Sequence, residues 1–149
     1  MVTEVRFGPA VVNADGAVLG RLASSLAKRL LMGEEIIVVN AEKAVVSGNP
    51  KVTEDFYLHR RQRGDRKKGP FFPRYPERIL RRTVEGMLPE NVRGREAIKR
   101  LSVHLGTPAE LKGKAEKAAK QASELHAKYE TLGDVGKALG AKPERWNVA

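Results

Sequence analysis

The apolar positions of the first forty residues form two different patterns, separated by a short polar turn. Between residues 19 and 30 they recur every three or four residues, as in a helix with one buried face. Six residues make up this stripe: Leu19, Leu22, Ala23, Leu26, Ala27 and Leu30. On either side, residues 10–13 and 35–40 are short apolar runs, and Ile36 to Val39 is apolar on both faces. This order predicts a right-handed strand, helix, strand crossover in a parallel sheet.

Two more helices are predicted in the middle of the chain. Pro50 suits the first position of a helix over residues 51–63, with Val52 and Phe56 expected to pack against the core. Pro76 starts the second of these helices. Its expected buried side consists of Ile79, Leu80, Val84, Met87 and Leu88. Its expected exposed side carries Arg78, Arg81, Arg82 and Glu85.

Shorter elements complete the predicted core. Residues 44–46 are a small strand candidate, and a short helix through Ala97 and Ile98 leads into an alternating strand at residues 101–105. These strands and helices predict an α/β core over residues 10–106.

The C-terminal part is predicted to be helical. Thr107 to Glu110 resembles a capping box and predicts a helix that continues to about Lys128. Its apolar stripe is narrow and mostly alanine: Leu111, Ala115, Ala118, Ala122 and Leu125. We therefore expect this helix to dock weakly, as an appendage, and a last short helix to cover residues 131–139. The 149 residues fit one domain, with 107–149 as a helical extension of the core.

Charge singles out the stretch from His59 to Arg82. It holds ten lysines and arginines against two acids, a net charge of +8, while the whole chain carries +10. Three aromatic residues and three prolines lie among these cations: Phe71, Phe72, Tyr75, Pro70, Pro73 and Pro76. Most charge runs are solvated or disordered faces. Here, however, rings that can stack on bases and guanidinium groups that can grip phosphates favour contact with a nucleic acid.

The loop from Gly64 to Pro76 is expected to be poorly ordered in the free protein and to become fixed on RNA. Its cations repel one another, and it has few aliphatic side chains to bury. A role at a membrane surface is disfavoured, because the charges do not follow one face of an amphipathic helix.

Residues that would perform catalysis or bind metal do not converge in the sequence. There is no cysteine, no phosphate-binding glycine loop, and no metal spacing among His59, His104 and His126. We expect no cofactor, no metal and no enzymatic activity. The alternative is a small α/β enzyme that acts on a nucleotide or phosphorylated substrate and uses the basic loop as a clamp. The sequence shows neither a signal peptide nor a membrane span, so we expect a soluble cytoplasmic protein.

Four sequence blocks, in order along most of the chain, resemble the family of the thirteenth protein of the large ribosomal subunit (the L-thirteen family). They are VVNADGAVLGRLAS at 11–24, VVNAEKAVVSG at 38–48, RTVEGMLP at 82–89 and RGREAIKRLSVHLG at 93–106. After Gly33 the chain lacks the longer insertion typical of bacterial members, and FFPRYPERILRRT is similar to archaeal and eukaryotic members. The archaeal type is therefore favoured. Residues 115–149 match no strong motif.

The resemblance implies a three-layer α/β/α domain with a small, mostly parallel four-stranded sheet. It also implies binding to large-subunit ribosomal RNA beside neighbouring ribosomal proteins, with no membrane and no small-molecule substrate. By analogy, Arg81, Arg82, Met87, Arg93, Gly94 and Arg95 lie in or beside the RNA-facing region. The basic stretch and the resemblance together predict these RNA-binding residues: Arg60, Arg61, Arg63, Arg66, Lys67, Lys68, Phe71, Phe72, Arg74, Tyr75, Arg78, Arg81, Arg82, Arg93, Arg95, Lys99 and Arg100.

Overall fold

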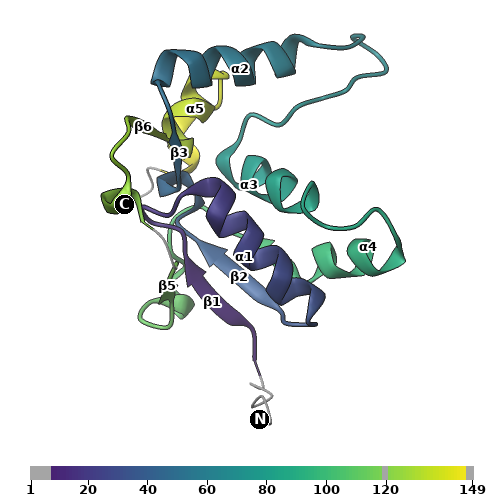
Figure 1. The fold of residues 1–149 in the computed structure, drawn as a ribbon, viewed down its shortest axis with the longest axis vertical. Helices are drawn as coiled ribbons and strands as arrows, with labels where there is room; N and C mark the ends of the chain where they lie inside the picture. The colour runs from purple at the N-terminus through teal and green to yellow at the C-terminus, as the bar shows by residue number, and fades with distance from the viewer. Residues whose placement is uncertain (1–7, 119–120, 147–149) are drawn as a thin grey trace.

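A parallel four-stranded sheet forms the centre of the protein (Figure 1). The structure, a computed structural model, describes residues 8–118 and 121–146. The strands lie in the order β4-β2-β1-β5 and comprise β1 (Ala10–Asn13), β2 (Ile36–Val39), β4 (Leu101–Val103) and β5 (Glu116–Lys117). Every neighbouring pair is parallel. The predicted α/β class with a mostly parallel four-stranded sheet is therefore confirmed.

The fourth strand is not the one that the sequence indicated. Residues 45–47 form β3 (Val45–Ser47), which pairs antiparallel with β6 (Tyr129–Thr131) in a separate two-stranded sheet. The edge of the main sheet is instead β5, which pairs with β1 through Val12 and Asn13. A strand of two residues is too short to show any alternation, so no periodicity could have revealed it.

Helix α1 (Leu19–Leu31) is the crossover between β1 and β2, and it buries the six residues of the predicted stripe. It packs beside α3 (Pro76–Glu85) and α4 (Val92–Lys99). One continuous apolar cluster joins these helices to the sheet face that carries Val12 and Val38. This face and the three helices meet in the main core, to which α5 (Leu132–Ala138) also contributes.

Helix α2 (Pro50–Gln62) extends away from the core (Figure 1). The Asn49 side chain caps its start by accepting a hydrogen bond from the Lys51 N–H at 3.2 Å. The expected packing of Val52 and Phe56 is wrong, since they are 65% and 53% exposed. The helix touches its neighbours along a narrow side only, and Thr53 and Tyr57, four residues apart, occupy that side.

Met87 was also expected to be buried, and it is 43% exposed. The reason is that α3 ends at Glu85, so the helical spacing no longer decides which way the next side chains point. Leu88, in the turn that follows, takes the buried position at 7% exposure.

The predicted helix from 107 to about 128 is wrong. Its described part contains two single-turn 3₁₀ helices, η2 (Ala109–Leu111) and η3 (Ala122–Glu124), with β5 between them. Residues 119–120 lie outside the described residues. Gly113 adopts a left-handed φ of 84°, which interrupts any helix there. The alanine stripe has too little area to hold a helix on the core, and pairing with β1 supplies backbone hydrogen bonds instead.

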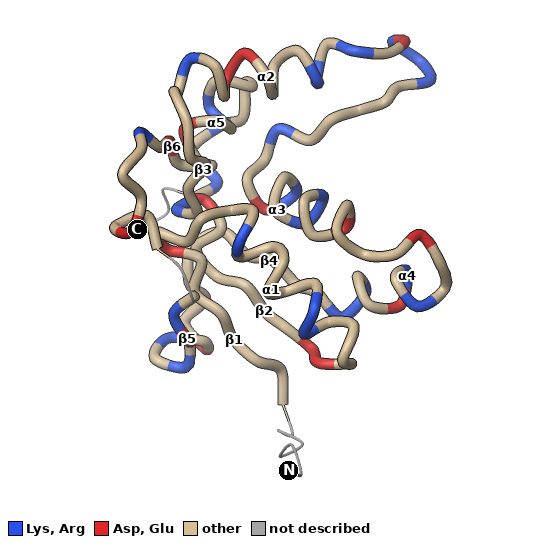
Figure 2. Tube along the Cα trace, viewed as in Figure 1, with Lys and Arg blue, Asp and Glu red and all other residues tan. Residues whose placement is uncertain are grey.

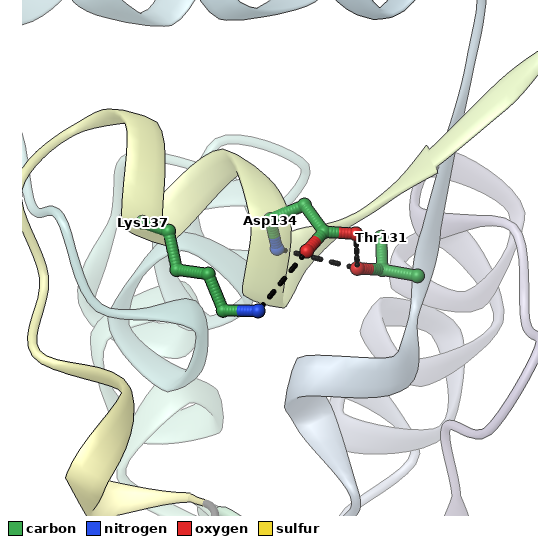
Figure 3. Close-up of polar contacts among 3 residues, drawn as sticks. All are labelled: Thr131, Asp134 and Lys137. Atoms are coloured by element: carbon green, nitrogen blue, oxygen red, sulfur yellow. Dashed lines mark hydrogen bonds and ion pairs between the residues drawn. The ribbon is translucent and has the colours of Figure 1, made fainter.

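The last predicted helix is confirmed as α5 (Leu132–Ala138), and it is firmly packed. Leu132 and Val135 are fully buried in the main core. The helix starts with a reciprocal cap: the Asp134 N–H donates to Thr131 Oγ1 at 3.2 Å, and the Thr131 hydroxyl donates to the Asp134 carboxylate at 2.7 Å (Figure 3). Gly140 follows with a φ of 87° and ends the helix.

Gly94 allows a test of how closely α4 packs against the turn that precedes it. A methyl group on Gly94 would overlap the carbonyl oxygen of Pro89 in the turn before α4. Because that oxygen belongs to the backbone, no side-chain rotation can relieve the overlap, and the turn itself must move. We expect Gly94→Ala to lower the free energy of unfolding by at least about 2 kcal/mol in urea titrations. The matched control is Gly20→Ala in α1, where the methyl group meets no atom within 4 Å. It should be neutral or stabilising by up to about 1 kcal/mol; equal losses in both variants would contradict the assigned contact.

Candidate nucleic-acid interface

Helix α2 and the segment after it, residues 50–75, form an arm that leaves the core and returns to it at α3. We call it the basic arm, because lysines and arginines follow one another along its far half (Figure 2). Between the arm and the α3–α4 region lies an open cavity of about 980 Å³. Four arginines line it, together with the acids Glu85 and Glu90: Arg60, Arg63, Arg82 and Arg95. We call this cavity the arginine groove.

Phe72 connects the two walls of the groove. It is buried at 7% exposure, with its ring centroid 5.7 Å from that of Tyr57. The guanidinium carbons of Arg60 and Arg82 lie 5.8 Å and 5.1 Å from the same ring. Arg60 also lies 4.9 Å from the Phe56 ring. Such cation–π contacts fix guanidinium groups in place and leave their N–H donors available for a ligand.

This burial changes the role predicted for Phe72. A ring enclosed between arm and core cannot stack on a base in this conformation, so Phe72 positions cations instead. Phe71, by contrast, is 68% exposed. Tyr75 is half-buried, with Arg74 at 5.5 Å and Arg145 at 4.7 Å from its ring. Arg145 was missed, because nothing in the sequence links the C-terminal region to this ring.

Burial also acts on Tyr57 beside the groove. It raises the pKa of the phenol above 10, while the positive charge of Arg60 opposes the shift. Tyr57 therefore stays neutral at physiological pH and adds no negative charge to the arginine groove.

The tip of the basic arm is a small closed turn. The N–H groups of Asp65 and Gly69 each donate to the other residue's carbonyl oxygen, at 3.1 Å and 3.0 Å. Gly64 precedes the turn with a φ of 98°, and any side chain on it would overlap Gly69. The turn carries Arg66, Lys67 and Lys68, all exposed. Whether the loop is poorly ordered without RNA stays a prediction.

Four of the predicted RNA-binding arginines serve the fold through hydrogen bonds to backbone carbonyls. Arg61 donates to Phe72 O at 3.0 Å, and Arg81 donates to Leu101 O at 2.8 Å. The other two hold carbonyls at the end of α1: Arg93 donates to Leu31 O at 3.1 Å, and Arg100 donates to Leu30 O at 3.0 Å. Arg81 is exposed, as predicted for this side of α3, but its guanidinium group is engaged by the fold. Its guanidinium closes the end of α4 with a second bond, to Ile98 O at 3.2 Å.

The other predicted cations are exposed, and none has a hydrogen bond or ion pair within residues 8–118 and 121–146. They are Arg60, Arg63, Arg66, Lys67, Lys68, Arg74, Arg78, Arg82, Arg95 and Lys99. Arg60, Arg63, Arg82 and Arg95 line the arginine groove. Arg66, Lys67 and Lys68 lie on the arm tip, while Arg74, Arg78 and Lys99 line neither. Unneutralised charge is therefore concentrated at the groove and the arm tip.

The carboxyl ends of the parallel strands, where α/β proteins usually bind nucleotides, are closed by internal hydrogen bonds. Asn40 Nδ2 donates to Asn13 Oδ1 at 2.9 Å, and the Thr107 hydroxyl donates to Asn40 Oδ1 at 3.1 Å. The Glu42 carboxylate accepts from the Gly106 N–H at 3.0 Å. In the described part of the chain, no group of three or more metal-ligating side chains could hold a metal ion, and no helix could cross a membrane.

Comparison with known proteins gives the family. The model of the family described as ribosomal protein L13 matches residues 9–110. The chain belongs to the ribosomal protein L13 family. The large ribosomal subunit protein uL13 of Archaeoglobus fulgidus is 50% identical over 135 residues, which cover 87% of this chain and 86% of the relative. The protein of the same name from Methanococcoides burtonii is 47% identical over 137 residues, covering 89% and 98%.

Family membership confirms the resemblance seen in the four sequence blocks, and the archaeal relatives agree with the expected archaeal type. L13 proteins are structural proteins of the ribosome and not enzymes, so the alternative of a nucleotide-processing enzyme is set aside. The matched residues 9–110 contain β1, β2 and β4 of the main sheet together with the whole basic arm.

The two roles of arginine on α3 can be separated by mutation. Arg81→Ala removes two hydrogen bonds to carbonyls and should lower the free energy of unfolding by about 1 kcal/mol. Arg78→Ala, on the same helix, removes an exposed side chain without such bonds and should change it by less than about 0.5 kcal/mol. Chemical denaturation of both variants measures the difference, and a null effect of Arg81→Ala would refute its structural role.

Proposed function

We propose that this protein is a structural component of the large ribosomal subunit in the cytoplasm and binds ribosomal RNA through the basic arm and the arginine groove. The observation that carries the proposal is the set of four exposed arginines around one groove, which have no hydrogen bond or ion pair within the described residues. Membership of the L13 family supports it, since the relatives are named as proteins of the large subunit. Neighbouring ribosomal proteins complete its expected surroundings.

The groove is suited to phosphate groups that follow one another along a backbone. Arg60 and Arg82 are held near one ring, so little side-chain entropy is lost when their planar N–H forks bind phosphate oxygens. Glu85 and Glu90 repel phosphates at the α3–α4 side and restrict the path of the RNA. Contacts of this kind position an RNA without reading its sequence.

The arm tip adds a second contact. The end of the arm lies away from the core (Figure 2). Its three consecutive cations, Arg66, Lys67 and Lys68, are exposed there, so they can reach RNA that the groove does not touch. Phe71 exposes its ring nearby in sequence and can stack on an unpaired base. An arm that binds RNA at both the arginine groove and the arm tip would link RNA segments during subunit assembly.

Phe71 and Phe72 provide a matched test of this division of roles. Phe71→Ala should leave the free energy of unfolding within about 0.5 kcal/mol and weaken RNA binding by roughly tenfold, because an exposed stacking ring is lost. Phe72→Ala should cost about 3 kcal/mol or more of stability, because a buried ring is removed. Thermal melts measure the loss of stability, and filter binding to large-subunit ribosomal RNA measures the loss of affinity. If Phe71→Ala lost stability and Phe72→Ala lost only affinity, the two assigned roles would be wrong.

Salt dependence tests the phosphate contacts directly. If the seven free cations of groove and tip meet phosphates, log affinity should fall against log salt with a slope of about −5 to −6. Replacing Arg60, Arg82 and Arg95 together by Ala should reduce the steepness by about 2 and abolish co-sedimentation with large subunits depleted of the native protein. Arg78→Ala is the control, because Arg78 lies outside the groove. A wild-type slope near −1 would rule out a phosphate clamp.

A further inference from the structure

A second cavity, of about 770 Å³, lies where α2, β6 and α5 meet. It is lined by three carboxylates, one from each element, namely Glu54, Glu130 and Asp134. We call it the acidic cleft. In a chain with a net charge of +10, such a gathering of carboxylates needs a reason.

Glu130 is the central group of the cleft. Its side chain belongs to a residue only 8% exposed, and its Oε2 atom has no hydrogen-bond partner among the described residues. Burial, a hydrogen bond to the Glu54 carboxyl and the charges of Glu54 and Asp134 together raise the pKa of Glu130 from 4.5 to about 7, and burial is the largest cause. When Glu130 is ionised, its carboxylate has no cation beside it in the described part of the chain.

The lysine that lines the cleft does not supply a cation to Glu130. Lys137 is the only cation that lines it within the described chain, and its Nζ bonds to Asp134 Oδ1 at 3.3 Å (Figure 3). Asp134 also serves as the cap partner of Thr131. From β3, the residue opposite Glu130 is the apolar Val46. Among the residues that the structure describes, Glu54 and Glu130 therefore face the cavity without a counter-charge.

The class of ligand follows from this geometry. The described side chains offer no arrangement of three ligands for a metal ion, so a compact divalent cation is disfavoured. RNA phosphates would be repelled by these carboxylates, and no residue that lines the arginine groove also lines the acidic cleft. A planar guanidinium group matches two adjacent carboxylates through paired hydrogen bonds.

We propose that the acidic cleft binds an arginine side chain of a neighbouring protein. RNA would then occupy the arginine groove and a protein the acidic cleft. The proposal rests on the proposed function only in placing the protein in the large subunit, beside other proteins. Binding of a guanidinium group in the cleft does not require RNA.

The test uses the free, full-length protein labelled with ¹⁵N and ¹³C and no RNA, so that failure of RNA binding cannot affect it. The probe is the blocked peptide acetyl-Gly-Arg-Gly-amide, with Gln in place of Arg as the control peptide. At pH 7.5 we expect saturable shift changes at Glu54, Tyr129 and Glu130, and a lower pKa of the Glu130 carboxyl, because the cation favours its ionised form.

Glu130→Gln should weaken the response at least about tenfold, while Glu124→Gln, an exposed change outside the cleft, should leave it unaltered. Glu54→Gln serves as a second variant. In wild type, ionisation of Glu130 opposes folding, so stability relative to Glu130→Gln should fall as the pH rises from 4.5 through about 7.

Three results would overturn the proposal. The arginine peptide could produce no saturable change, or the same change in Glu130→Gln. Mg²⁺ alone could produce the shifts without the peptide, which would make the cleft a metal site. An RNA oligonucleotide could shift the same resonances, which would make the cleft part of the RNA surface.

Discussion

The burial of Phe72 fixes the return of the basic arm to the core. Without this ring between Tyr57 and α3, the described contacts that shape the segment from 63 to 73 would be its glycine turn and the bond from Arg61. The same ring holds Arg60 and Arg82, so one apolar contact sets both the course of the chain and the spacing of two cations. The interface is thus a product of packing as much as of charge.

Arginine has two opposite uses in this fold. Arg93 and Arg100 donate to carbonyls at the end of α1, where a helix leaves its last acceptors unsatisfied. Arg81 does the same at the end of α4. Residues such as Arg63 and Arg95 remain exposed around a cavity. The local sequence looks alike in both cases, because the choice depends on which carbonyls the tertiary structure brings within reach.

Elements with a strong period were predictable from the sequence, and elements held by distant partners were not. The stripe of α1 and the starts of α2 and α3 at Pro50 and Pro76 follow from local rules, as does the parallel pairing of β1 with β2. By contrast, β5 exists because β1 offers an open edge, and Met87 is exposed because a helix ends two residues before it. For the site, the basic stretch was apparent, but the buried role of Phe72 and the contact with Arg145 required the fold.

Because α5 packs closely against the base of the basic arm, the arm can reach its final packing only after α5 has been synthesised. Gly136 leaves room for the carbonyl of Arg74 and the ring of Pro76, at distances where even a methyl group would be crowded. A ribosome delivers the chain from the N-terminus, so residues 50–82 emerge well before this support exists. The arm that is proposed to hold RNA reaches its final packing only when the last fifth of the protein has been made. A nascent chain therefore carries its positive charge before it can present that charge in a fixed geometry.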